Sequence, residues 1–85
     1  MELIELFQEA VAASKTLASK PDNDTLLKLY ALYKQATEGD NTNSGPSNAF
    51  DFVAKFKHEA WEKLKGLDKA GAMQQYIDLV ESLKS

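Results

Sequence analysis

Two tyrosines, a lysine and a threonine recur at helical spacing in one short stretch of the sequence. Residues three and four positions apart are neighbours on one side of a helix. The side in question carries Tyr30, Tyr33, Lys34 and Thr37. Aromatic rings beside an ammonium group suit a ligand with a flat ring system and an anion, although tyrosines at this spacing are also common core residues. The stretch is therefore a candidate binding face.

The elements that would position these side chains are helices. Four stretches show the 3.6-residue apolar period of amphipathic helices. We expect helices over residues 2–18, from about 23 to 38, from about 51 to 65 and from about 69 onward. Three breaks separate these helices, because proline and glycine interrupt helices: Lys20-Pro21, a polar loop over 39–48, and Lys65-Gly66. Asp22 or Asn23 can cap the second helix, and Asp68 can cap the fourth. The sequence predicts one all-α domain spanning residues 1–85, without strands.

Each expected helix has an apolar face, and three lysines lie at the margins of these faces. A lysine there keeps its stem against apolar surface and its ammonium group in water. The three are Lys15, Lys34 and Lys57, although Lys15 could equally be a lysine that answers the helix dipole. The expected faces consist of Leu3, Ile4, Phe7, Ala10, Val11, Ser14 and Leu17; Leu26, Leu29, Tyr30, Tyr33 and Ala36; Phe52, Phe56, Ala60, Trp61 and Leu64; and Met73, Tyr76, Ile77, Val80 and Leu83.

Composition excludes several classes of function. The 85 residues carry a net charge of −3, ten lysines, no arginine and no cysteine. An acidic balance argues against non-specific nucleic-acid binding, and a chain without cysteine has neither disulfides nor thiolate metal ligands. No apolar run approaches the roughly 20 residues of a membrane span, and the first residues lack the features of a signal peptide. We expect a cytoplasmic monomer with no stable membrane insertion, no nucleic-acid partner, no metal and no cofactor.

Two blocks of the sequence stand out by their combined spacing. The first reads Tyr30-x-x-Tyr33-Lys34-Gln35-Ala36-Thr37-x-Gly39-Asp40. The second reads Lys57-x-x-Ala60-Trp61-x-x-Leu64-Lys65-Gly66-x-x-Lys69-x-x-Ala72-Met73-x-x-Tyr76-Ile77. With the Lys20-Pro21 turn, they resemble the acyl-CoA-binding protein family over essentially the whole chain.

The resemblance implies a small four-helix bundle of up-down-down-up type, with a long crossover loop between helices two and three. It also implies high-affinity binding of long-chain fatty acyl-CoA esters by an intracellular carrier and buffer in lipid transport and fatty acid metabolism. In the family, the positions matching Tyr30, Tyr33, Lys34 and Lys57 contact the adenine and the 3′-phosphate region of CoA. Those matching Lys15 and Tyr76 complete the ligand site.

A departure at the expected ligand site and two alternative functions accompany this interpretation. His58 stands where animal members commonly carry a second tryptophan beside the ligand lysine. An enzyme is disfavoured, because the chain has no cysteine nucleophile, and a single histidine with scattered acids lacks metal-ligand spacing, so no catalytic or metal-binding residue is expected. The remaining alternative is a helical protein-interaction bundle without a small-molecule ligand, in which the tyrosines are core and the lysines solvated.

Overall fold

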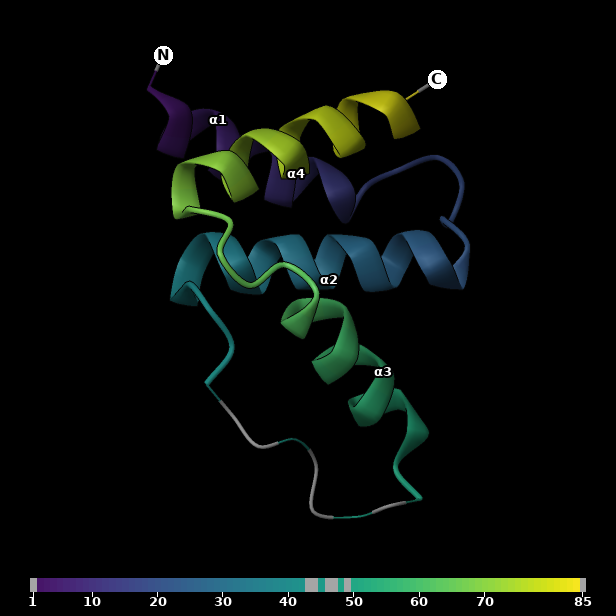
Figure 1. Ribbon diagram of the computed structural model, residues 1–85. Helices are drawn as coiled ribbons and strands as arrows, with labels where there is room; N and C mark the ends of the chain where they lie inside the picture. Colours follow the sequence, from purple (N-terminus) through teal and green to yellow (C-terminus); the bar gives the residue numbers. More distant parts are fainter. Residues whose placement is uncertain (1, 43–44, 46–47, 49, 85) are drawn as a thin grey trace.

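The computed structural model describes residues 2–42, 45, 48 and 50–84. Within them it contains four helices and no strand: α1 (Leu3–Ser14), α2 (Asn23–Glu38), α3 (Phe52–Glu62) and α4 (Lys69–Leu83). α1 and α4 run in one direction, and α2 and α3 run broadly in the other (Figure 1). The predicted all-α bundle with up-down-down-up order is confirmed. The crossover from α2 to α3 includes residues 43, 44, 46, 47 and 49, which lie outside the described part of the chain.

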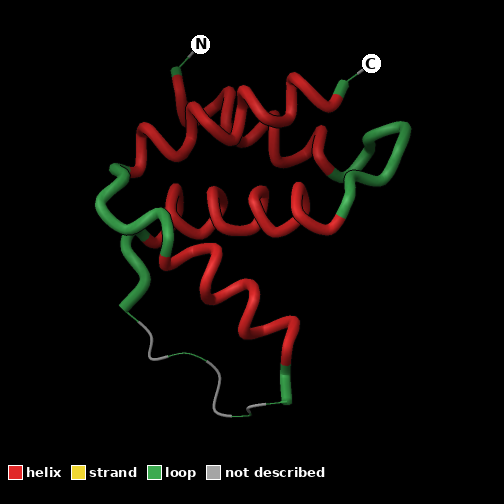
Figure 2. The backbone as a smooth tube through the Cα atoms, turned by 45° about the vertical axis from the view of Figure 1, so that its right-hand side comes forward, coloured by secondary structure: helices red, strands yellow, loops and turns green. Residues whose placement is uncertain are grey.

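α2 is the central helix of the bundle. It packs against α4 on one side and α3 on the other, while α1 packs against α4. Figures 1 and 2 show α2 between the layer formed by α1 and α4 and the single helix α3. The core cluster consists of Phe7, Ala10, Leu29, Leu32, Ala36, Ala72, Tyr76 and Val80. Because α2 has partners on two sides, Ala31, Leu32 and Gln35 are buried in addition to residues of its expected apolar face.

Aspartates set the starts of three helices. Asp22, Asp51 and Asp68 each accept a hydrogen bond from the backbone amide three residues later, at 2.8, 3.1 and 2.9 Å. These bonds satisfy amides that have no partner inside the helix. The side-chain hydrogen bond from Thr25 lowers the pKa of Asp22, because it favours the ionised carboxylate. Asp22 and Asp68 therefore cap α2 and α4, as the sequence predicts.

α1 is shorter than the expected helix over residues 2–18. It ends at Ser14, whose hydroxyl donates to the Val11 carbonyl at 2.7 Å. The next two amides, of Lys15 and Thr16, donate to carbonyls three residues back. Such bonds tighten the last turn, and serine and threonine hydroxyls compete with the helix ladder for its carbonyls. Lys15 therefore lies in the turn that follows α1.

α3 is held to the bundle mainly near its C-terminal end. Trp61 is buried, and its indole nitrogen donates to the Gly39 carbonyl at 2.9 Å. The N-terminal half of α3 diverges from α2 in both backbone views (Figures 1 and 2). Phe52 and Phe56, expected on the apolar face, are accordingly 58% and 51% exposed. The helix ends at Glu62 rather than at about residue 65, and a turn follows.

A buried glutamine joins the end of α2 to the turn between α3 and α4. Gln35 is fully buried, and its amide nitrogen donates to Asp40 at 2.8 Å and to the Leu67 carbonyl at 2.6 Å. The same Asp40 oxygen accepts the Gly66 amide at 2.9 Å. The Gly66 amide first, and Gln35 second, lower the pKa of Asp40, since both bonds favour the carboxylate. Gln35 and Asp40 thereby fix how α3 approaches α2.

Candidate ligand-binding site

A cavity between α1 and α2 collects four of the six predicted site residues. We call it the tyrosine cavity; its volume is about 310 Å³. It is lined by Val11, Ser14, Lys15, Leu26, Leu29, Tyr30, Tyr33 and Tyr76. Three aromatic rings and the Lys15 side chain thus line one small hollow, although the rings come from α2 and α4 and Lys15 comes from the turn after α1.

Core packing holds the tyrosines of this cavity in place. The Phe7 ring stacks on Tyr33 at 6.0 Å and meets Tyr76 edge-on at 5.2 Å between ring centroids. The Tyr76 hydroxyl donates to Ser14 Oγ at 3.1 Å. Tyr76 is only 4% exposed, whereas Tyr33 is 41% exposed. Tyr76 therefore contributes a fixed core wall, and Tyr33 presents a ring that a ligand can cover.

The other two predicted residues lie along the seam between α2 and α3. The Lys57 ammonium lies 5.1 Å from the centroid of the Tyr30 ring, and the Lys34 ammonium lies 5.0 Å from Trp61. α2 and α3 each supply one lysine and one aromatic ring, four residues apart. The lysine of each helix contacts the ring of the other helix. Both distances fall within the range of cation–π attraction. Tyr30 also lines the tyrosine cavity, so Lys57 lies at the edge of that hollow.

Lys34 differs from the other two site lysines in its charge environment. It forms an ion pair with Glu38, one turn later on α2. The hydrogen bond to Glu38 is the main cause that raises the pKa of Lys34. Among the described residues, the ion pairs involve Lys34, Lys65 and Lys84, so neither Lys15 nor Lys57 takes part in one.

The divergence of α3 opens an apolar groove beside these lysines. We call it the α2–α3 groove; its volume is about 540 Å³. Val53 and Phe56 of α3 form one wall, with Lys57 at the edge. The α2 wall consists of Leu26 and Leu27, with the polar Asn23 and Asp24 at the start of the helix. Leu26 also lines the tyrosine cavity, so the two hollows adjoin along α2. The exposed apolar side chains of α3 thus border a groove that can take an apolar ligand.

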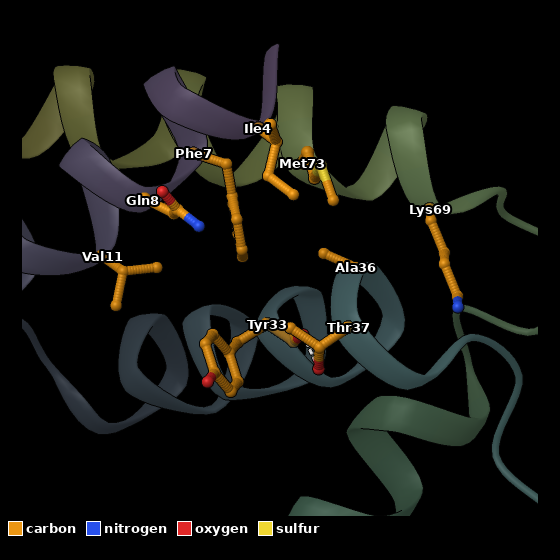
Figure 3. A pocket seen from close by; sticks show the side chains of 9 residues that line it. All are labelled: Ile4, Phe7, Gln8, Val11, Tyr33, Ala36, Thr37, Lys69 and Met73. Carbon is orange, nitrogen blue, oxygen red and sulfur yellow. Dashed lines mark hydrogen bonds between the residues drawn. The ribbon is translucent and has the colours of Figure 1, made fainter. Parts of the chain in front are cut away.

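A third hollow continues from the tyrosine cavity towards the start of α4. Its volume is about 500 Å³, and it shares Val11 and Tyr33 with the tyrosine cavity. Figure 3 shows Phe7 pointing from α1 towards Tyr33 on α2, with Met73 and Lys69 contributed by α4. The tyrosine cavity therefore shares lining residues with both of the other hollows.

His58 faces the crossover loop. Its Nδ1 atom lies 3.0 Å from the side-chain nitrogen of the buried Asn41, which can only donate. With the Asn41 amide in this orientation, Nδ1 is the acceptor in this hydrogen bond. The ring also lies against Gly45: a Cβ at position 45 would lie 3.4 Å from Nε2. At the position of the family's second tryptophan, this chain thus has a residue that binds its own loop.

The arrangement brings apolar side chains, aromatic rings and lysines together along α2. Within the described residues, no group of three or more histidines, cysteines or acids could hold a metal ion. None of the helices in that part of the chain is long and apolar enough to cross a membrane. The sequence prediction did not include Trp61 or Glu38 as contacts of Lys34, although the spacing of Lys34 and Glu38 by four residues was visible.

The fold and the site define a small four-helix bundle in which an apolar groove adjoins a lysine- and tyrosine-lined cavity. A sequence model described as Acyl CoA binding protein matches residues 4–80. The chain belongs to the acyl-CoA-binding protein family, as its sequence blocks indicated.

Individual relatives agree with this assignment. The chain is 52% identical over 77 residues to acyl-CoA-binding protein homolog 1 of Caenorhabditis elegans, covering 91% of this chain and 88% of the relative. It is 48% identical over 79 residues to the acyl-CoA-binding protein of Saccharomyces cerevisiae, covering 93% and 90%. Enoyl-CoA delta isomerase 2 of Rattus norvegicus is 51% identical over 79 residues, which are 93% of this chain but 20% of that protein. The similarity to the isomerase therefore concerns one part of a longer protein.

Solved structures support the same fold. The crystal structure of acyl-CoA-binding protein 2 of Oryza sativa is similar with a TM-score of 0.90 at 39% identity, covering 96% of this chain and 90% of that one. The corresponding protein of Moniliophthora perniciosa gives a TM-score of 0.87 at 33% identity, covering 98% and 80%. The arrangement of the four helices is thus shared with crystallographically determined members of the family.

Proposed function

We propose that this chain binds one long-chain fatty acyl-CoA ester per monomer and acts as an intracellular carrier and buffer of these esters in the cytoplasm. The observation that carries the proposal is the α2–α3 groove, whose apolar walls end at Lys57 and Tyr30. An apolar tail and an anionic headgroup can therefore be held side by side. Family membership and the names of the relatives support the same ligand.

The acyl tail would lie against Leu26, Leu27, Val53 and Phe56 in the α2–α3 groove. Burial of each methylene stabilises the complex by about 0.8 kcal/mol, roughly fourfold in affinity. A dozen or more methylenes would therefore supply most of the affinity, and the exposed apolar side chains of α3 offer them a surface.

The CoA headgroup would occupy the tyrosine cavity and the adjoining seam. Tyr30 and Tyr33 provide ring faces for the adenine, and Lys34 and Lys57 flank the 3′-phosphate. Lys15 and Tyr76 complete the site at the far wall of the cavity. Lysines at aromatic margins suit phosphates, since a charged hydrogen bond contributes about 1.5–3 kcal/mol.

Calorimetry with a long-chain acyl-CoA tests the proposal directly, with free CoA as the control for the tail. We expect tight 1:1 binding of the ester and much weaker binding of CoA. If the ester gives no heat and no saturable binding, the carrier function is wrong. The exposed Phe52, which does not line the groove, would then favour the protein-interaction bundle.

We also propose that the chain performs no catalysis and needs no metal or cofactor. His58, the single histidine of the sequence, is bonded to Asn41 rather than to a nucleophile. A thioester hydrolysis assay at stoichiometric protein would contradict this proposal if acyl-CoA were turned over faster than in buffer.

A further inference from the structure

Glu38 forms an ion pair with Lys34, the least exposed of the three lysines at the proposed site. The side chain of Lys34 is 25% exposed and lies between the Trp61 ring and the Glu38 carboxylate. The side chain of Glu38 is 53% exposed, so the carboxylate reaches Lys34 from the solvent side. An anion that approaches Lys34 from solvent therefore meets a negative charge that already holds the ammonium group.

The stability of α2 does not account for an acid at this position. Glu38 is the last residue of α2, whose last turn contains no basic residue. The negative end of the helix dipole disfavours a carboxylate there. The order of the pair is also the weaker one, because a lysine that precedes its glutamate by four residues is less favourable than the reverse. The main effect of Glu38 is therefore expected on Lys34.

We propose that Glu38 is an intramolecular competitor for the ligand phosphate, which lowers the affinity of the site for 3′-phosphorylated CoA esters and speeds their release. The proposal rests on the proposed function, since it assumes that Lys34 meets the 3′-phosphate. A phosphate monoester carries about −1.5 to −2 charges at pH 7, so it can displace a single carboxylate from Lys34. The displaced Glu38 then remains nearby as a repelling charge. The ion pair thereby weakens Lys34 as a phosphate contact. Lys57, which forms no ion pair within the described part of the chain, is not weakened in this way.

A ligand without the 3′-phosphate lacks the group that would displace Glu38 from Lys34. Glu38 should therefore penalise acyl-CoA but leave 3′-dephospho-acyl-CoA unaffected. In this way Glu38 reduces the ability of the site to discriminate between the two esters, and removal of its charge should restore that discrimination.

The test compares wild type, Glu38→Gln and Glu81→Gln by titration with the same long-chain acyl-CoA and its 3′-dephospho analogue. Glu81, near the end of α4, is a matched control, because it also pairs with a lysine, the helix-capping Lys84, and its substitution changes the net charge equally. We expect Glu38→Gln to bind the phosphorylated ester about two- to fivefold more tightly, the range set by an exposed ion pair. Its affinity for the dephospho ester and both affinities of Glu81→Gln should match wild type.

Each other outcome has a definite meaning. Equal tightening of both esters by Glu38→Gln, or the same gain in Glu81→Gln, would show a general charge effect and overturn the proposal. Unchanged or weaker binding of the phosphorylated ester by Glu38→Gln would overturn it as well. Failure of the wild type to bind either ester would instead refute the proposed carrier function, so the two failures are distinguishable.

Discussion

The Lys57 ammonium group lies 5.1 Å from the centroid of the Tyr30 ring, across the seam between α2 and α3. Lys34 and Trp61 form the reciprocal contact at 5.0 Å. Each contact contributes about 0.5–1 kcal/mol at an exposed site. The rings therefore hold both lysines against α2 and α3 before a ligand arrives, which reduces the side-chain entropy that binding must remove.

Removal of either seam lysine should weaken binding through the phosphate. We expect Lys57→Ala to cost about 1.5–3 kcal/mol of binding free energy for acyl-CoA, the range of a charged hydrogen bond. Lys34→Ala should cost less, since its ammonium must first leave Glu38. Titrations of wild type, both variants and the double variant against acyl-CoA and 3′-dephospho-acyl-CoA measure these costs and their coupling.

The dephospho ester is the control for both lysine variants. Against it, the cost of each substitution should largely vanish, because the partner of the lysine is already absent. Equal costs with both esters would contradict the assignment of Lys34 and Lys57 to the 3′-phosphate, even if the carrier function held.

The α2–α3 groove should impose a dependence on acyl chain length. Affinity should rise by up to about fourfold per added methylene and level off once the groove is filled. Dissociation constants for a series of even-chain esters measure this increment. Phe56→Ala should reduce the increment, because Phe56 lines the groove, whereas Phe52→Ala should not, because Phe52 lies outside it. A flat series in the wild type would exclude the buried tail.

His58 should affect stability rather than ligand affinity. His58→Ala removes one acceptor of the buried Asn41 amide, so we expect the free energy of unfolding to fall by about 0.5–1.5 kcal/mol. Urea denaturation measures the loss. The exposed neighbour Glu59 is the control, since Glu59→Ala should change stability by no more than about 0.5 kcal/mol. A clear loss of acyl-CoA affinity in His58→Ala at unchanged stability would place the ring at the ligand site instead.

Protonation of Asp40 in acid should lower the free energy of unfolding. Its hydrogen bonds from Gly66 and Gln35 lower its pKa below the ordinary value of 3.8, so its carboxylate stabilises the fold above that pH. This contribution is lost as the pH falls through the lowered pKa, where the folded protein must also take up the proton. Asp40→Asn retains an acceptor oxygen but does not titrate. The difference in unfolding free energy between wild type and Asp40→Asn should therefore shrink as the pH falls below 3.8 and through the lowered pKa. A constant difference over that range would contradict the role of Asp40.

The features predicted correctly from the sequence depend on local chemistry. Asp22 and Asp68 cap the helices that follow them because a carboxylate needs only the amide three residues later. The helix order, which the structure confirms, came from the resemblance, and so did the set of site residues, which stays a prediction. Four of those residues meet in the tyrosine cavity, and the other two lie on the adjoining seam.

The features that sequence reasoning missed depend on distant partners or on competition within a turn. A polar residue such as Gln35 is expected at the surface, yet it is buried. Its side-chain amide donates to the carbonyl of Leu67, 32 residues later. Helical periodicity groups Phe52 and Phe56 on one face, but it does not indicate whether another element covers that face. α1 ends at Ser14, where the side-chain hydroxyl donates to the Val11 carbonyl. An apolar pattern does not indicate such a side-chain hydrogen bond.

α3 packs against α2 alone among the described helices, and its N-terminal half buries little apolar surface. Segments with few buried contacts open locally at a lower free energy than the whole protein unfolds. Amide hydrogen exchange of α3 should therefore be faster than that of α2 and α4, and saturation with acyl-CoA should slow it more than exchange in any other helix. The least stable helix of the unliganded protein would then be the one that ligand binding stabilises most.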